Sequence, residues 1–199
     1  MSDSLITKRA IATSIKELMR KKSFPKISVS DIVQNCGINR QTFYYHFKDK
    51  YDLVNWIYYD EVVAVIRSKR FDDWNEIVLA ILTSMNREQH FYKNVLNNIE
   101  QNTLQNDFFD VTKKIITERM DAFAKDKELD RKDKDFVADF YAYGLAGIIV
   151  QWAHHEMKES PEQMVRRMQY FIKDNSKILG EESQRMTEPK SMALNFLIK

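Results

Sequence analysis

Cysteine, glycine and proline are scarce in this 199-residue chain, which contains one, four and three of them. The single cysteine, Cys36, excludes an internal disulfide framework and is typical of a reducing compartment. So few glycines and prolines leave few turn signals, which predicts a mostly helical structure. No N-terminal signal-peptide pattern is present, and the longest apolar run, at about residues 141–153, is too short to span a bilayer and contains Gln151. We therefore expect a cytoplasmic protein without membrane contact.

The net charge of +2 hides a difference between two parts of the chain. Residues 1–50 contain ten Lys/Arg and four Asp/Glu, a net charge of +6, so residues 51–199 carry −4. This charge difference indicates that the basic N-terminal part binds a polyanion and that the acidic remainder does not. The alternative is a chance clustering of cations on a solvated surface.

Hydrophobic periodicity predicts an all-α fold, because no segment keeps the period of a strand. A first helix is expected to end at Pro25, and later helices are expected at about 50–67, 73–87, 90–102, 105–125, 132–157 and 161–179. We divide the chain into an N-terminal domain (1–50), a connecting helix (51–70), a larger helical domain (71–180) and a tail (181–199). Whether the tail docks or is disordered stays open at this point.

Two short helices joined at a glycine form a helix-turn-helix pattern near the N-terminus. Ser28 is a good N-cap for the first helix, and Gly37 supplies a turn residue free of Cβ strain. Asn39 caps the second helix, in which Phe43 and Phe47 face the small core four residues apart. The remaining side chains of this helix face outward: Arg40, Gln41, Thr42, Tyr44, Tyr45 and His46.

The outward side chains suit different parts of a DNA duplex. Arg40 and Gln41 lie at the N-terminal end of the second helix, which enters the major groove, where Arg pairs with guanine and Gln with adenine. Tyr45 suits either a thymine methyl group or the DNA backbone. Contacts with phosphate oxygens are expected from the shorter donors and the flanking cations, which are Ser28, Thr42, Tyr44, His46, Lys48 and Lys50.

The stretch ISVSDIVQNCGINRQTFYYHFKDKYDL resembles the N-terminal DNA-binding domain of TetR-family transcriptional regulators. The family pattern T-[FL]-Y-x-[HY]-F-x-[DN]-K-x-x-L runs here from Thr42 to Leu53. This resemblance implies a homodimer that binds a palindromic double-stranded DNA operator, an effector-binding larger domain, and release of a repressor by the effector. It also implies base reading by Arg40, Gln41 and Tyr45, and phosphate contacts from Ser28, Thr42, Tyr44 and Lys50.

Within that family, the chain further resembles the branch that activates dihydroxyacetone-kinase operons. This resemblance rests on the stretch quoted above together with the VNWIYYDE that follows it, and on the later segment EQHFYKNVL. That branch implies an activator or co-regulator controlled by a protein partner instead of a small molecule. A third hypothesis is an interaction module that keeps the fold without binding DNA. The retained Thr42, Tyr44, His46 and Lys50 argue against this third hypothesis.

The larger domain contains many bulky side chains, which more often form a plain core than a ligand cavity. The family resemblance favours a cavity, and an effector pocket would be lined by Met85, Phe91, Phe108, Met120, Phe123, Phe140 and Tyr143. A dimer interface is expected on the last two helices, because one recognition helix reads too few base pairs for genomic specificity. Its predicted residues are Ile148, Gln151, Trp152, Met164, Arg167, Met168 and Phe171.

Catalytic patterns are absent from the sequence, which has no Gly-rich phosphate loop, nucleophile elbow or paired His/Cys arrangement. His154, His155 and Glu156 are metal-ligand types, but neighbouring residues on a helix point about 100° apart and do not easily share one site. We predict neither enzymatic activity nor a cofactor nor a bound metal.

Overall fold

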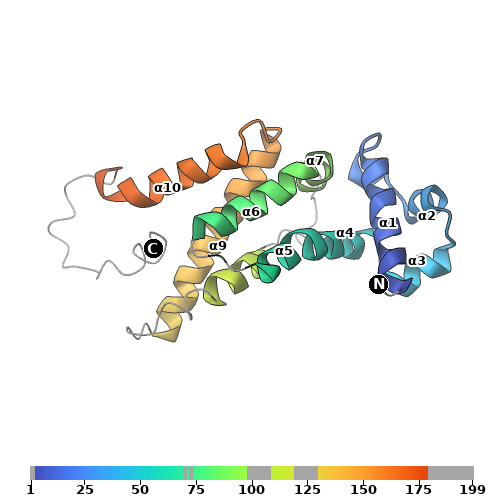
Figure 1. The fold of residues 1–199 in the computed structure, drawn as a ribbon, viewed down its shortest axis with the longest axis horizontal. Helices are drawn as coiled ribbons and strands as arrows, with labels where there is room; N and C mark the ends of the chain where they lie inside the picture. The colour runs from blue at the N-terminus through green and yellow to red at the C-terminus, as the bar shows by residue number, and fades with distance from the viewer. Residues whose placement is uncertain (1–2, 70, 72–73, 98–108, 119–129, 179–199) are drawn as a thin grey trace.

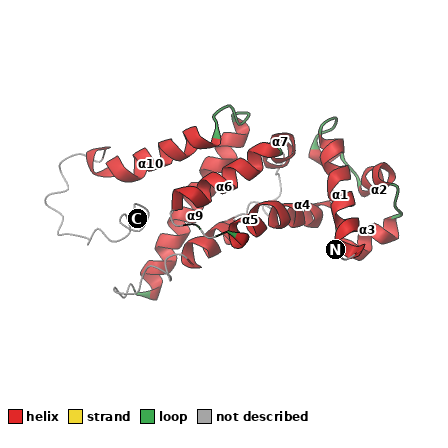
Figure 2. Ribbon diagram, in the orientation of Figure 1, coloured by secondary structure: helices red, strands yellow, loops and turns green. Residues whose placement is uncertain are grey.

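The computed structural model describes residues 3–69, 71, 74–97, 109–118 and 130–178, and every regular element in these ranges is helical (Figures 1 and 2). The all-α prediction is therefore confirmed. The elements are α1 (Asp3–Met19), the 3₁₀ turn η1 (Phe24–Lys26), α2 (Val29–Cys36), α3 (Arg40–His46), α4 (Lys50–Tyr58), the π-helical η2 (Tyr59–Val63), α5 (Ala64–Ser68), α6 (Trp74–Arg87), α7 (Gln89–Asn97), α9 (Arg131–His154) and α10 (Pro161–Ile178). Residues 109–118 are helical as well.

The head, defined as α1 to α3, forms a small compact unit at one end of the molecule (Figure 1). Its core is made of side chains from each helix, and Ile11, Ile15, Ile32 and Phe43 are all 0% exposed. Leu53, from the first turns of α4, closes this core and is also 0% exposed. The head thus depends on the start of α4 for its packing.

Local capping explains where the short helices of the head begin and end. The Ser28 hydroxyl accepts from the backbone N–H of Asp31, and Gly37 ends α2 in the left-handed conformation with φ of 70°. Asn39 caps α3 through its side chain. The prediction that Pro25 ends the first helix was wrong, because α1 stops at Met19 and Pro25 lies within η1.

The connector, defined as α4, η2 and α5 (residues 50–68), is one continuous helical path from the head into the body (Figure 1). In its middle the backbone widens to a π-helix, in which the N–H of Ala64 bonds the carbonyl of Tyr59. Leu53 and Ile57 face the core before this point, whereas Val62 and Val63 do so within it. Asp60 and Glu61 are consequently only partly buried and remain available to partners from α1.

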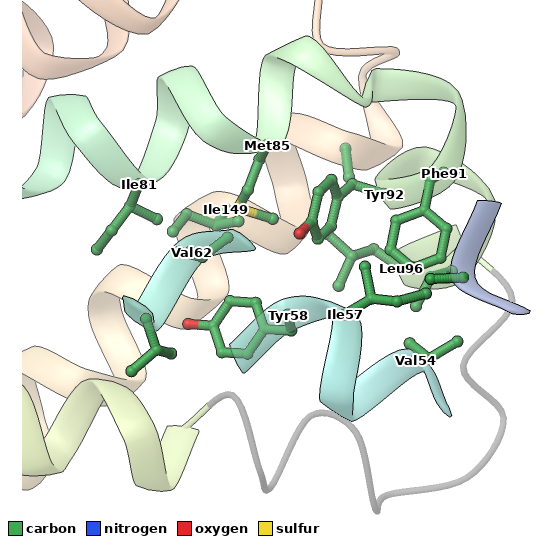
Figure 3. Close-up of a cluster of buried hydrophobic side chains, with 14 of the residues drawn as sticks. Val54, Ile57, Tyr58, Val62, Ile81, Met85, Phe91, Tyr92, Leu96 and Ile149 are labelled. Carbon is green, nitrogen blue, oxygen red and sulfur yellow. The ribbon is translucent and has the colours of Figure 1, made fainter. Parts of the chain in front are cut away.

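The body, defined as residues 74–97, 109–118 and 130–178, packs around the connector. Figure 3 shows side chains of the connector meeting others from α6, α7 and α9 in one hydrophobic cluster. Ile57, Met85, Phe91 and Ile149 are each at most 1% exposed there. Further along the chain, α10 packs against α6. Each described element of the body therefore contributes to a core that also holds the connector.

Among the described helices, α9 is the one that is long and apolar enough to cross a membrane by composition, with a mean hydropathy of 1.3 in its most apolar window. A core helix passes the same test, and one side of α9 does lie in the core. Ala142, Ile149 and Ala153 on that side are 0% exposed.

Candidate nucleic-acid interface

Helix α3 has one buried side and one strongly exposed side. Phe43 and Phe47 anchor it, with 0% and 2% of their surface exposed. The opposite side is exposed and follows the helical spacing i, i+1, i+4 and i+5, with the residues Arg40, Gln41, Tyr44 and Tyr45. Lys48, just beyond the end of the helix, is exposed as well. Tyr44 and Tyr45 are 56% and 82% exposed. A projecting helix with guanidinium, amide, phenol and ammonium groups has the shape and donors that a DNA major groove accepts.

The first turn of α3 is fixed by its N-cap. The Asn39 side-chain oxygen accepts from the backbone N–H of Thr42 at 2.8 Å and from the Thr42 hydroxyl at 3.0 Å. The hydroxyl proton of Thr42 is thus already donated within the protein. Because phosphate oxygens accept but do not donate, the predicted phosphate contact of Thr42 requires this proton to turn away from Asn39.

Arg40 is held by a residue that the sequence prediction missed. Its Nη2 donates to the hydroxyl of Ser30, which lies in the first turn of α2. A guanidinium has five N–H donors, so the others remain free for base edges. No spacing rule in the sequence singles out Ser30, since the contact depends on the angle between α2 and α3.

The N-terminus of α2 already binds an anion, the carboxylate of Asp31. Oδ2 of Asp31 accepts from the Ser28 N–H at 2.8 Å and from the Ser28 hydroxyl at 2.7 Å. Lys22 donates to Oδ1 at 3.1 Å. These hydrogen bonds, above all that of the Ser28 backbone, lower the pKa of Asp31 to about 2. A DNA phosphate predicted to contact Ser28 would meet this negative charge.

The ammonium group of Lys50 points into the protein. It donates to the carbonyl oxygens of Phe24, Pro25 and Ile27 at 3.0, 3.1 and 2.8 Å, and it lies 4.7 Å from the centre of the Phe24 ring. Burial lowers the pKa of Lys50 below its ordinary value. All three ammonium donors have protein acceptors, so a phosphate contact by Lys50 would break at least one of these bonds.

The remaining predicted DNA contacts lie at the C-terminal end of α3. The half-buried His46 ring lies edge-on to the Tyr45 ring, with centroids 4.9 Å apart. Lys48 is exposed, while its backbone N–H donates to Asp52 at 2.8 Å. Lys8 of α1 adds a cation that the prediction missed, with Nζ 5.4 Å from the centre of the Phe47 ring. Lys8 and Lys48 thus place positive charge near the C-terminal end of α3.

The four predicted effector-pocket residues that the structure describes divide between core and surface. Met85 and Phe91 are each 1% exposed and lie in the body core. Phe140 and Tyr143 are 63% and 66% exposed on α9, outside that core, and their place in an effector pocket stays a prediction. The other three predicted residues, Phe108, Met120 and Phe123, lie outside the described residues.

The predicted dimer residues divide between surface and core. Ile148, Gln151 and Arg167 are exposed and Met168 is partly buried. Trp152 and Met164 are 3% and 7% exposed and pack within the protomer, where Trp152 Nε1 donates to the Glu159 carbonyl at 2.9 Å. Phe171 lies on α10, and its side chain is outside the described set.

An exposed apolar face, here called the α9 stripe, was not predicted as a unit. Its residues recur at helical spacing along α9 and are Phe136, Phe140, Tyr143, Gly144, Gly147 and Ile148. Phe136 is 71% exposed, and a Cβ added at Gly144 or Gly147 would meet no atom within 4 Å. Because α9 has apolar residues on all sides, periodicity in the sequence does not separate this face from the core side.

The body core holds one polar atom that no residue of the described chain satisfies. The Tyr92 hydroxyl is buried and has no hydrogen-bond partner there (Figure 3). Burial, followed by the Glu61 carboxylate, raises the pKa of Tyr92 well above its ordinary value. The hydroxyl is therefore neutral and retains an unused donor.

Metal-ligating side chains do not converge in the described ranges, where no group of three His, Cys, Asp or Glu lies close enough to hold an ion. His154 and His155 are both exposed at the end of α9. Gln151 Nε2 and His155 Nε2 lie 3.2 Å apart.

Comparison with known proteins gives matches at both ends of the chain. A family model described as "Bacterial regulatory proteins, tetR family" matches residues 11–57, and one described as "Transcriptional regulator C-terminal region" matches residues 72–174. The predicted family resemblance is confirmed by these two matches.

Individual relatives are similar over different lengths. The chain is 34% identical over 96 residues to the HTH-type dhaKLM operon transcriptional activator DhaS of Lactococcus lactis subsp. lactis, which is 48% of this chain and 51% of the relative. The chain thus spans about half the length of that curated relative. A solved structure, Dihydroxyacetone kinase operon activator DhaS, superposes with a TM-score of 0.66 at 23% identity, over 87% of this chain and 98% of the other. That superposition supports the fold.

Proposed function

This chain belongs to the TetR family of DNA-binding transcriptional regulators, and from this premise we propose that it is a homodimeric switch that binds a DNA operator. The observation that carries the proposal is the two-sided helix α3. Phe43 and Phe47 fasten it to the head, the opposite side projects Arg40 and Tyr45, and the exposed Lys48 follows directly after the helix. Such an element delivers side chains into a major groove without distorting its own domain.

Within this function, Arg40, Gln41 and Tyr45 read bases, and Tyr44, His46 and Lys48 contact phosphates. Ser30 orients the guanidinium of Arg40 through their hydrogen bond. We assign a structural part to Ser28 and Lys50, because their donors are used by Asp31 and by three backbone carbonyls.

A second copy of the chain is the proposed occupant of the α9 stripe. The stripe combines exposed aromatic rings with Gly144 and Gly147, which allow another backbone to come close. To read one side of the duplex, the two α3 helices of such a two-fold dimer must lie about 34–36 Å apart, the separation of successive major grooves. The resulting site is palindromic, because each half is read by the same residues.

For control, an activator or co-regulator that responds to a protein partner has the better support. The partly matching relative is named as an operon activator, and Met85 and Phe91, which were expected to line a pocket, are packed in the core. A small-molecule effector is the second candidate. Its supporting observation is the buried Tyr92 hydroxyl, since an unused donor inside a core is the kind of group that a polar ligand satisfies.

Selection of bound sequences from random double-stranded DNA tests the central proposal. We expect enrichment of a palindrome whose affinity falls steeply with salt, because lysines and arginines release counterions from the duplex. Enrichment of no palindrome at any salt concentration would overturn operator binding.

Expression of the gene next to a selected operator distinguishes the modes of control. Deleting the gene for this protein should lower the expression of the neighbouring gene if the protein is an activator, and raise it if the protein is a repressor. The site proposed here has no catalytic role, and it operates in the cytoplasm, where the DNA lies.

A further inference from the structure

One contact between helix α7 and the head is made by a side-chain amide, that of Asn94. Its Oδ1 accepts from the backbone N–H of Phe24 at 2.7 Å. Its Nδ2 donates to the carbonyl oxygens of Met19 and Lys22, both at 2.9 Å. These three partners are 70 to 75 residues away in sequence and lie at the end of α1, in the turn that follows it and at the start of η1.

The chemistry of this contact is specific for an amide. The last carbonyls of a helix find no N–H partner within the helix, and the Asn94 NH₂ group donates to one of them, that of Met19, and to the Lys22 carbonyl in the turn that follows. The same side chain supplies an acceptor to the first N–H of η1. A carboxylate would offer no donor, and an aliphatic side chain would offer neither group.

A second contact joins the head to the body on the side of the connector. Lys16 of α1 pairs with Glu61 of η2, and its Nζ lies 3.6 Å from Glu88 at the junction of α6 and α7. The Lys16 side chain is 13% exposed, and its Nζ lies 5.6 Å from the centre of the Phe91 ring. Helix α1 is therefore attached to α7 or its preceding turn at two separate places.

These attachments matter because of how the head is otherwise joined. The connector is the covalent link between head and body, and a single helical link allows the head to swing about it. A further attachment away from that link fixes the angle. Asn94 provides this second attachment at the C-terminal end of α1. A small displacement at that end would turn the whole head.

We propose that Asn94 is a positioning residue that transmits the placement of α7 to the head and so sets the separation of the two recognition helices. The proposal rests on the dimeric operator binding proposed above. It gives α7 a route to the DNA that does not pass along the connector. A protein partner or a small-molecule effector that displaced α7 would then tilt α1, and α3 with it.

The test compares Asn94→Ala and Asn94→Asp with the wild type in a selection from random DNA that contains half-sites at every spacing. Asn94→Asp keeps the acceptor for the Phe24 N–H but places a carboxylate oxygen against two carbonyls. We expect both variants to keep the half-site sequence and to lose preference for one spacing over its neighbours by about fivefold, the effect of a net loss of one ordinary hydrogen bond.

Asn97→Ala is the matched control, because Asn97 is exposed on the same helix and lines the same hollow between α7 and the end of α1. It should keep the wild-type spacing preference. If Asn94→Ala does not fold, Asn94→Ser makes the same comparison with a smaller change. A uniform loss of affinity at all spacings, with the preference unchanged, would overturn the positioning role. Failure of the wild-type chain to enrich a palindrome would instead overturn the proposed function.

Discussion

Helices α3 and α9 both expose aromatic rings, but the surroundings of those rings differ. On α3, Tyr44 and Tyr45 are 56% and 82% exposed and lie among Arg40, Gln41 and Lys48. On α9, Phe136, Phe140 and Tyr143 are 71%, 63% and 66% exposed. From residue 140 to residue 155 the sequence contains no Lys, Arg, Asp or Glu.

The contrast teaches that exposure alone does not define a binding surface. Rings with hydroxyls beside cations suit a polyanion, since each ring supplies contact area while the neighbours supply charge and donors. Phe140 and Tyr143 begin a stretch of α9 that has two glycines and no charged residue, and such rings suit another hydrocarbon surface, because their contact releases water from both sides. The same chain thus carries one surface for DNA and another for protein.

Phe140→Glu should have the largest effect, because it places a carboxylate in the apolar α9 stripe. The two-fold axis places the change twice in the interface, and about 2 kcal/mol lost per copy raises the dimer Kd roughly a thousandfold. Sedimentation equilibrium measures that constant. Helical content by circular dichroism should stay unchanged, because Phe140 is exposed in the protomer.

Tyr45→Glu is the matched control on the other helix. It should abolish operator binding through repulsion of phosphates and leave the dimer Kd as it is. If Phe140→Glu remained as dimeric as the wild type, the α9 stripe would not be the interface.

Lys50→Met tests whether Lys50 stabilises the fold, in contrast to the exposed Lys48, which is proposed to bind DNA. We expect the free energy of unfolding to fall by about 2 kcal/mol, because hydrogen bonds from a charged donor to three carbonyls are lost. Urea unfolding measures it. Lys48→Met, which removes an exposed charge nearby, should change stability by less than about 0.5 kcal/mol. Equal stabilities for the two variants would contradict the structural role of Lys50.

Arg40→Ala tests whether the polar residues on α3 read sequence as well as bind charge. Discrimination at one base pair of each half-site should fall by about 1–3 kcal/mol. Lys48→Ala should weaken all DNA sequences alike and lower the slope of log affinity against log salt by about one per protomer. Competition binding with single-base operator variants separates the two patterns, and a uniform loss for both would remove Arg40 from base reading.

Asp31→Asn should have the smallest effect and concerns the edge of the DNA-binding surface. The folded pKa of about 2 lies below the ordinary value of 3.8, so the stabilisation is fully present above pH 3.8 and is lost as pH falls through 2. The difference in urea midpoint between wild type and Asp31→Asn should therefore shrink across this interval. A constant difference at every pH would show that the charge of Asp31 is irrelevant.

Much of the head could be predicted because its signals are local. Ser28, Gly37 and Asn39 define helix ends through bonds to residues three or four positions away, and Phe43 and Phe47 share one helix face. The outward direction of Tyr45 follows from that same face. These features need no knowledge of the rest of the chain.

The failures have a physical cause in long-range contacts. Lys50 resembles a phosphate ligand in the sequence, but its acceptors are carbonyls 23 to 26 residues earlier. Helix α9 has apolar residues on all sides, so periodicity does not distinguish its core side from the exposed side of Phe140 and Tyr143. Asn94 gives no signal at all, since its partners are backbone atoms.

The π-helical η2 sets the rotational phase of the connector. With α-helical spacing throughout, the core side that includes Leu53 and Ile57 would continue near residue 61 and at Ala64. The buried residues are instead Val62, Val63 and Ile66. The one extra residue in the π-helical turn therefore lets α4 and α5 each turn their apolar side chains toward the core that they contact. Because a residue corresponds to about 100° of helix rotation, the direction in which the head faces is encoded in the length of a single turn.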